Sequence, residues 1–183
     1  MQIRQEKKSD RDVVYEVIRE AFADTEGRSG QEQELVNALR GSRSFLPRLS
    51  LVAVEGRTVV GHILFTKADI GGQTELALAP VCVLPAYRRN GIGTALIREG
   101  HRIAEALGFT CSAVLGSPFF FGRTGYLPAS LYGVKPPKKV PDENFMLYRF
   151  SSSREVPKGT VLYDAAFRLY DGFRLYDGLE EFS

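Results

Sequence analysis

The turn that runs from Arg88 to Gly93 carries the residue types best suited to holding an anion. Gly91 and Gly93 allow a ligand to come close to the backbone and permit φ values that other residues avoid. A helix is predicted to begin here, and the first turn of a helix presents unpaired N–H groups and a positive dipole end. Arg88 and Arg89 add mobile positive charge. These features suit a diphosphate, although a plain glycine-rich turn between a strand and a helix would contain the same glycines.

Two well-known phosphate sites do not fit this segment. The dinucleotide-binding fingerprint requires a third glycine at position 96, where the chain has Leu96, and an early strand at the start of the chain. The nucleotide-binding P-loop requires Gly-Lys-Ser/Thr after the glycines, and that run is absent. The residues alone therefore indicate a diphosphate site that belongs to neither group.

The same stretch resembles motif A of the GNAT N-acetyltransferase superfamily, a strand followed by Arg/Gln-x-x-Gly-x-Gly/Ala and a helix. Arg88, Gly91 and Gly93 occupy the three defining places, and the lead-in Val-x-Val-x-Pro-x-Tyr-Arg-Arg matches as well. Over roughly residues 1 to 165 the chain resembles one bacterial subgroup, the YhbS-like predicted acetyltransferases. The segments that carry this wider likeness are Gly61–Phe65, Leu78–Pro80 and Leu115–Tyr126.

The resemblance implies that acetyl-CoA is the bound cofactor. It would lie in a V-shaped opening between the strand ending at Leu84 and the next parallel strand, Cys111–Leu115. The backbone of the first strand would pair with the pantetheine, and the following turn would hold the diphosphate. The residues implied for cofactor binding are Val81, Cys82, Val83, Arg88, Arg89, Asn90, Gly91, Ile92, Gly93 and Thr94.

The proton donor of the family has no counterpart in this chain. Many GNAT enzymes place a tyrosine four residues before the glycine of a Gly-Phe pair, where it protonates the departing thiolate. Here Gly125-Tyr126 marks the pair, and Phe121 occupies the position of the acid. Three accounts stay open: the thiolate leaves unaided or through water, another tyrosine such as Tyr126 or Tyr132 serves, or the protein binds the cofactor without efficient transfer.

Candidates for the base that deprotonates an amine are few. His62 lies in a strand beside the expected cleft, with a hydrogen-bonded core histidine as the alternative. Glu75 lies near the start of the central strand, where it could equally be a solvated turn carboxylate. His101, in the middle of a helix, is expected at the surface or in packing. The acceptor side of this fold would also bring in three acidic residues that could instead form a charged helix face: Glu26, Glu32 and Glu34.

Hydrophobic periodicity predicts the elements that position these groups. Helices are expected over Ser9–Phe22, with an acidic capping box from Ser9 and Asp12, around Leu35–Leu39 up to Gly41, and from Gly93 to Gly108. Strands are expected at Leu51–Val54, Thr58–Phe65, Leu76–Leu84, Cys111–Leu115 and Asn144–Phe150. The strand–turn–helix–strand run is a βαβ unit beside an antiparallel meander. The fold class is therefore α/β with a mixed sheet (the GNAT fold), splayed at the cofactor cleft and with helices on both faces.

Composition bounds the remaining possibilities. The 183 residues have a net charge of +2, and no basic block with interleaved aromatics indicates nucleic acid binding. Cys82 and Cys111 are far apart, which argues against a zinc site or a disulfide framework. No signal peptide or membrane span is evident, so a reduced, cytoplasmic protein is expected.

One domain of residues 1–150 suffices, followed by an extension of residues 151–183. The extension contains FRLYDG twice in succession, and its aromatic residues are expected to pack on the domain or on a partner subunit, which would allow a homodimer. Two functions follow. The chain is either an N-acetyltransferase that moves acetyl from acetyl-CoA to a primary amine of a small molecule or protein, or an acyl-CoA-binding module that senses or oligomerises with little catalysis.

Overall fold

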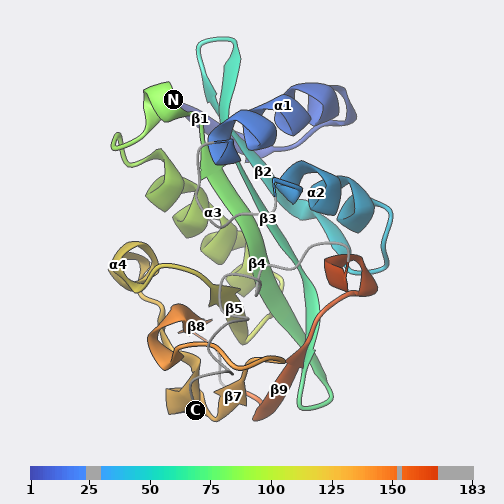
Figure 1. Ribbon diagram of the computed structural model, residues 1–183, viewed down its shortest axis with the longest axis vertical. Coiled ribbons are helices and arrows are strands. Elements are labelled where there is room, and N and C mark those ends of the chain that lie inside the picture. Colours follow the sequence, from blue (N-terminus) through green and yellow to red (C-terminus); the bar gives the residue numbers. More distant parts are fainter. Residues whose placement is uncertain (24–29, 152–153, 169–183) are drawn as a thin grey trace.

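The computed structural model describes residues 1–23, 30–151 and 154–168 of the chain (Figure 1). The helices are α1 (Arg11–Phe22), α2 (Glu32–Arg40), α3 (Ile92–Ala106) and α4 (Pro118–Phe121). The strands are β1 (Gln2–Gln5), β2 (Phe45–Glu55), β3 (Thr58–Ile70), β4 (Gln73–Val83), β5 (Cys111–Leu115), β6 (Leu127–Pro128), β7 (Val134–Lys135), β8 (Phe145–Arg149) and β9 (Gly159–Leu162).

The strands form a mixed sheet in the order β1-β2-β3-β4-β5-β8-β6. All neighbours along this path are antiparallel except β4 and β5, which are joined through α3 and run parallel. β9 pairs with the far end of β3, where Ile70 lies opposite Val161, and also with β7. The mixed sheet and its single βαβ unit confirm the fold class predicted from the sequence.

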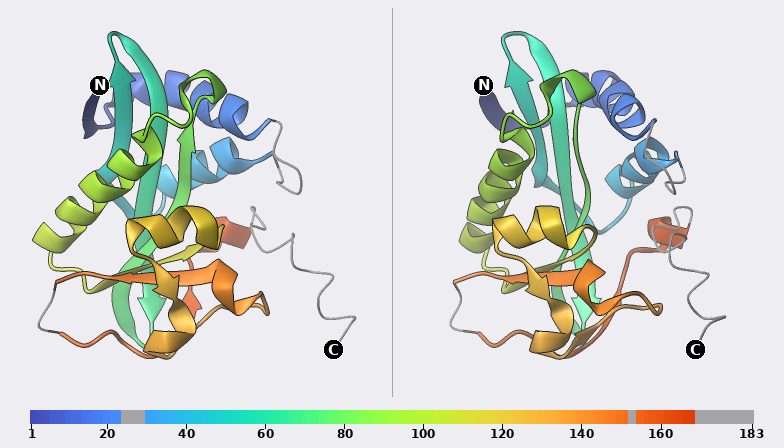
Figure 2. Two further views of the ribbon diagram at one scale, coloured as in Figure 1. Left: turned by 90° about the vertical axis from the view of Figure 1, so that its left-hand side faces the viewer. Right: turned by 60° about the vertical axis from the view of Figure 1, so that its left-hand side comes forward.

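Helices cover both faces of the sheet, as Figure 2 shows from two directions. α1 and α2 pack on one face around buried residues that include Val14, Ile18, Leu35 and Leu64. α3 packs on the other face, where its residues Leu96, Ile97 and Ala104 meet side chains from β2, β3 and β4. Each helix buries one apolar stripe, which is the pattern that the spacing of its apolar residues predicts.

The start of α1 differs from the sequence prediction. The Asp10 carboxylate, and not the Ser9–Asp12 pair, organises this end, since it accepts a hydrogen bond of 2.7 Å from the Lys7 backbone N–H. The same carboxylate forms an ion pair with Arg4 of β1 at 2.6 Å. The spacing of apolar residues in the predicted helix would place Val13 on the buried face, but Val13 is 42% exposed. The helix is therefore rotated so that only part of its predicted apolar stripe faces the sheet.

The sequence analysis did not predict four strands: β1, β9 and the two-residue strands β6 and β7. β1 is a short edge strand, and its sequence Gln-Ile-Arg-Gln lacks the apolar alternation that indicates a strand. β9 is equally short and lies within the segment 151–183, so part of that segment adds to the sheet. Of the repeated FRLYDG run, only Phe167 and Arg168 lie within the described residues. A separate extension and its role stay predictions.

Among the helices of the described ranges, none is long and apolar enough to cross a membrane. Glu26, one of the acidic residues expected on the acceptor side, lies outside the described residues.

Candidate active site

A bulge in β4 creates the opening at the centre of the sheet. Ile63 of β3 lies opposite Val81, but Phe65, two residues further along, lies opposite Leu78. β4 therefore contains one extra residue over this stretch, and the Ala79-Pro80 peptide bond within it is cis. A bulge of this kind bends its strand and interrupts the pairing.

Past the bulge, β4 and β5 separate. The two strands pair only at Leu76 with Ser112 and at Ala77 with Ala113, and no further pairing between them occurs in the described part of the chain. The backbone edge of residues 81–83 that faces β5 therefore has no strand beside it. The splayed sheet predicted from the sequence is present at this place.

α3 begins where the anion-binding turn was expected. Gly91 precedes the helix with φ 76°, a left-handed conformation that favours glycine, and Arg89 has φ 64°. The first bond of the helix runs from the Ala95 N–H to the Gly91 carbonyl oxygen at 2.9 Å. No side chain caps this end, so the amides of Ile92, Gly93 and Thr94 point out of the helix without an intrahelical acceptor.

The two arginines of the turn behave differently. The Arg88 guanidinium donates hydrogen bonds to the Val83 carbonyl oxygen at 3.3 Å and to the Ala21 carbonyl oxygen at 2.6 Å. It therefore ties the turn to β4 and α1 and is not the mobile cation predicted from the sequence. Arg89 is exposed. Next to the turn lies a cavity of about 710 Å³ whose lining includes Arg98 and Arg102 of α3.

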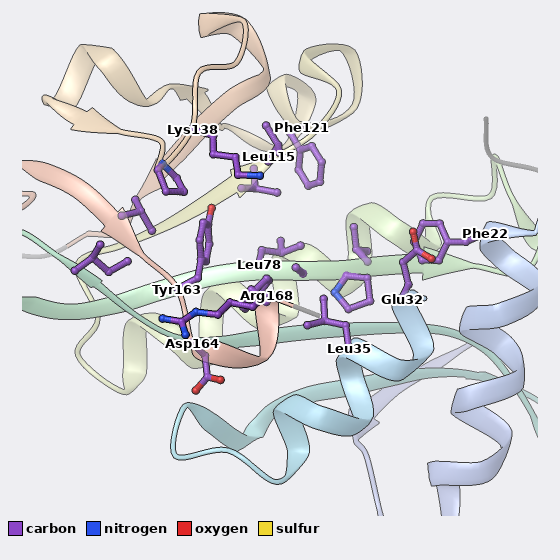
Figure 3. A pocket seen from close by; sticks show the side chains of 18 residues that line it. Phe22, Glu32, Leu35, Leu78, Leu115, Phe121, Lys138, Tyr163, Asp164 and Arg168 are labelled. Atoms are coloured by element: carbon purple, nitrogen blue, oxygen red, sulfur yellow. The ribbon is translucent and has the colours of Figure 1, made fainter. Parts of the chain in front are cut away.

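A second cavity, of about 720 Å³, lies in the opening between β4 and β5 (Figure 3). Its walls come from α2, from the bulge of β4, from the end of β5 and from the segment that follows β9. The residues that line it are Phe22, Glu32, Leu35, Leu78, Ala79, Pro80, Val81, Val114, Leu115, Phe121, Pro137, Lys138, Val161, Leu162, Tyr163, Asp164, Phe167 and Arg168. The cavity thus includes Val81, on the β4 edge where the pantetheine was expected, and is largely apolar.

Phe121 of α4 lines this cavity and is 7% exposed. The position at which the family places its acid therefore does face the reaction space, but it contributes only a hydrocarbon ring. Phe121 itself therefore donates no proton.

The structure brings Tyr163 into the same cavity from the segment after β9. In Figure 3 its hydroxyl points toward the side of the cavity where Lys138 and Leu115 lie. Burial raises the pKa of the Tyr163 hydroxyl above its usual value, so the group keeps its proton at neutral pH. The sequence analysis missed this residue, whose one signal is that it follows the buried Val161 by two positions.

Glu32, the first residue of α2, is completely buried and lines the opposite part of the cavity. Glu32 and Phe22 appear at the same end of the cavity in Figure 3. Glu32 precedes Leu35 and Val36 by three and four residues, so it shares the buried stripe of the helix. Of the acidic residues expected on the acceptor side, Glu34 instead lies at the surface, where the Tyr15 hydroxyl donates a hydrogen bond to it.

His62 does not face the cleft. It is fully buried on the α1/α2 side of β3, where its Nε2 lies 3.1 Å from the Ser50 hydroxyl and 3.9 Å from the Glu6 carboxylate. Burial, assisted by the nearby Arg40 cation, lowers the pKa of His62 to about 3. The ring is therefore neutral and is absent from the lining of the cavity, so we do not assign His62 as the base.

Glu75 is also a structural residue. It is fully buried, and its Oε2 accepts hydrogen bonds from the Thr110 N–H at 2.7 Å and the Cys111 N–H at 3.2 Å. It lies near the start of β4, two residues before the last pairing with β5, and is absent from the lining of the cavity. The carboxylate holds the backbone at the start of β5 in place, and we do not assign it as the base.

Tyr126 is fully buried behind β5 in a cluster of aromatic rings. Its hydroxyl lies 3.3 Å from the Ser112 hydroxyl and 3.1 Å from Nε2 of His101, and its ring meets Phe121 edge-on. Burial raises the pKa of Tyr126. Because Tyr126 is absent from the lining of the cavity, we do not assign it as the acid. His101, 7% exposed, packs in the same cluster, as one of the two expectations had it.

Comparison with known proteins agrees with this geometry. The model of the acetyltransferase (GNAT) family matches residues 12–119. The chain is 34% identical over 155 residues to YjhQ of Escherichia coli, an uncharacterized N-acetyltransferase, which covers 82% of this chain and 83% of YjhQ. A solved GNAT family acetyltransferase from Brucella melitensis, in complex with acetyl-CoA, is 34% identical with a TM-score of 0.75 over 91% of this chain and 97% of that one. YhbS of Escherichia coli, solved with CoA, is 25% identical with a TM-score of 0.81 over 91% of each chain.

Proposed function

The chain belongs to the GNAT acetyltransferase family, and we propose that it transfers acetyl from acetyl-CoA directly to a primary amine in the cavity between β4 and β5. The donor is acetyl-CoA, and the enzyme is an acyltransferase. The observation that carries the site assignment is the continuity of three features: uncapped amides at the start of α3, an unpaired β4 edge, and a cavity beyond the bulge.

The diphosphate of the donor is assigned to the amides of Ile92, Gly93 and Thr94. These N–H groups and the positive end of the α3 dipole favour an anion. A Cβ at Gly93 would lie 3.2 Å from the Phe120 ring. Because glycine has no Cβ, the space between the Gly93 backbone and this ring stays open to the diphosphate. The neighbouring hollow at the start of α3 suits the nucleotide end of the donor, with Arg98 as its cation, since Arg102 is paired with Glu99 at 2.7 Å.

The pantetheine is assigned to the free edge of β4 at residues Val81 to Val83, where it would take the place of a strand. The Cys82 thiol plays no chemical part in this assignment, because its side chain is buried on the α1/α2 face and burial raises its pKa to about 12. The thioester then reaches the cavity between Val81 and Leu115. Ligands in open sheets of this type bind beyond the carboxyl ends of the parallel strands.

The proton chemistry is assigned to two residues that line the cavity. The Glu32 carboxylate attracts the ammonium form of the acceptor and accepts its proton, which leaves a neutral amine. The amine nitrogen attacks the thioester carbon, the carbon–sulfur bond breaks, and the electron pair leaves with the sulfur. The Tyr163 hydroxyl, at the end of the cavity opposite Glu32, gives its proton to the thiolate through an intervening water. The proton released from the new amide nitrogen restores Tyr163 through solvent, and Glu32 returns its proton to solvent.

Phe121 favours a second function, an acyl-CoA-binding module with little catalysis. The two functions separate when acetyl-CoA binding is measured by calorimetry and thiol release is measured with a panel of primary amines. Binding together with amine-dependent thiol release supports the enzyme. Binding without thiol release above the background hydrolysis for any amine would reject it in favour of the module. A homodimer and a cytoplasmic location stay predictions.

A further inference from the structure

The charged side chains of the cavity between β4 and β5 are unevenly placed. Of the 18 residues that line it, 13 are apolar, so the few polar groups decide which ligand orientation is favourable. Figure 3 shows Glu32 and Phe22 at one end, and Lys138 and Tyr163 toward the other. The Arg168 side chain lies on the Tyr163 side as well. A carboxylate and two cations therefore flank an apolar middle.

The second carboxylate of the lining does not face the cavity. Asp164 accepts a hydrogen bond from the Ser44 hydroxyl at 2.7 Å and another from the Ala166 N–H at 2.8 Å. Figure 3 shows its carboxylate directed away from Lys138 and Glu32. Through these contacts Asp164 connects the segment after β9 to Ser44, which immediately precedes β2. It does not neutralise the cationic end of the cavity.

We propose that the acceptor is a small primary amine with an apolar body and an anionic group at the end opposite the amine. This inference rests on the proposed function and names the substrate class for the same site. The ammonium lies at Glu32, the body contacts the apolar wall that includes Leu35 and Leu78, and the anion lies near Lys138 and Arg168. A complementary placement of charges orients the amine toward the thioester.

The size of the cavity favours a small molecule. Its volume of about 720 Å³ lies within the range of small-molecule sites, and the thioester end of the donor takes part of that space. The segment that follows β9 closes one side with Tyr163 and Phe167. Lys138 and Arg168 are exposed at the rim, so they can meet an anion that keeps part of its hydration.

Three benzylic amines that differ only in the para substituent test the proposal. Para-aminomethylbenzoate carries a carboxylate at that position, benzylamine has no substituent there, and para-xylylenediamine carries a second ammonium. Each is titrated by calorimetry into protein saturated with CoA, and each is assayed for thiol release from acetyl-CoA. We expect the benzoate to bind about fivefold tighter than benzylamine, and the diamine to bind more weakly than both. Lys138→Glu combined with Arg168→Glu should invert this order. Lys139→Glu, an exposed neighbour outside the cavity lining, should preserve it.

Equal affinity for the benzoate and benzylamine, an order unchanged by the double charge reversal, or failure of all three to bind would overturn the inference. So would a lysine-containing peptide that is acetylated with a higher kcat/KM than the benzoate. The proposed function fails separately. Thiol release with benzylamine and without preference for the benzoate refutes only the substrate class, whereas acetyl-CoA binding without thiol release for any amine refutes the transfer itself.

Discussion

The Arg88 guanidinium donates a hydrogen bond of 2.6 Å to the carbonyl oxygen of Ala21, which joins the turn before α3 to the last turn of α1. The same guanidinium reaches the Val83 carbonyl oxygen at the end of β4. The arginine of the family motif therefore holds three elements together around the expected diphosphate position. We therefore expect Arg88 to contribute to cofactor binding by fixing the turn in place.

Replacing this arginine should weaken cofactor binding and leave the chemistry intact. In Arg88→Ala the turn loses both hydrogen bonds, and we expect the KM for acetyl-CoA to rise about fivefold, which corresponds to about 1 kcal/mol, with kcat within about twofold of the wild type. Steady-state kinetics checks this. Arg57→Ala, at an exposed position in the β2–β3 turn, is the matched control and should change neither value. A lower kcat with an unchanged KM in Arg88→Ala would contradict the positioning role.

A charge at Gly91 should act on the diphosphate through electrostatics alone. Gly91→Asp and Gly91→Asn have the same shape and share the cost of the left-handed backbone, about 1 kcal/mol. No atom lies within 4 Å of the Cβ position, so neither side chain meets a clash. We expect the aspartate variant to bind acetyl-CoA at least about tenfold more weakly than the asparagine variant, with a gap that narrows at high salt. If calorimetry gave equal affinities of the two variants for acetyl-CoA, the diphosphate would not lie at the turn that contains Gly91.

Tyr163→Phe should remove the proton donor. Because general acid catalysis contributes about 10²–10⁴-fold, we expect kcat to fall about 10²-fold while calorimetric affinity for acetyl-CoA stays unchanged. Tyr126→Phe is the matched control: it loses hydroxyl contacts in the buried aromatic cluster, so it should lower the free energy of unfolding by about 1 kcal/mol with kcat nearly unchanged. If Tyr126→Phe reduced kcat more than Tyr163→Phe, the acid assignment would be reversed.

The stability of the fold should fall as the pH drops below about 6.5. The chain has two histidines, and burial, aided at His62 by the Arg40 cation, lowers the pKa to about 3 for His62 and about 4 for His101. Between these values and the unfolded pKa of about 6.5, the unfolded state binds more protons, so stability is full above about 6.5 and is lost as the pH falls.

The two histidines together set a limiting slope of about 2.7 kcal/mol per pH unit. Urea unfolding between about pH 7 and about pH 5 measures this slope, and His101→Gln should reduce it by about half. A free energy of unfolding that stays constant over this interval would show that the histidines are accessible to protons in the folded protein.

The cofactor turn could be predicted from the sequence because its signal is local. Gly91 has the left-handed backbone that favours glycine, and α3 follows immediately. The strand that contains His62 was equally clear, but the face on which a strand residue lies depends on the alternation of the whole strand. His62 is two residues before Leu64, which packs against α1 and α2, so it lies on that face and away from the cleft. The alternation of β3, once Leu64 is placed on the face covered by α1 and α2, excludes His62 from the cleft.

The remaining groups depend on long-range contacts that no local pattern reveals. Tyr163 reaches the cavity only because Val161 pairs with Ile70, and the two strands concerned are far apart in the sequence. Glu75 is committed to the backbone amides of Thr110 and Cys111, an arrangement that requires the parallel pairing of β4 with β5. A four-residue strand such as β9 is too short for hydrophobic periodicity to indicate it.

The most direct test of the account is a crystal structure of the protein with acetyl-CoA and a slowly reacting acceptor. We expect the diphosphate on the amides of Ile92 to Thr94, the pantetheine along Val81 to Val83, and Tyr163 as the polar side chain nearest to the thioester sulfur. A diphosphate bound away from the start of α3, or a sulfur remote from Tyr163 and placed outside the cavity lined by Phe121, would contradict it.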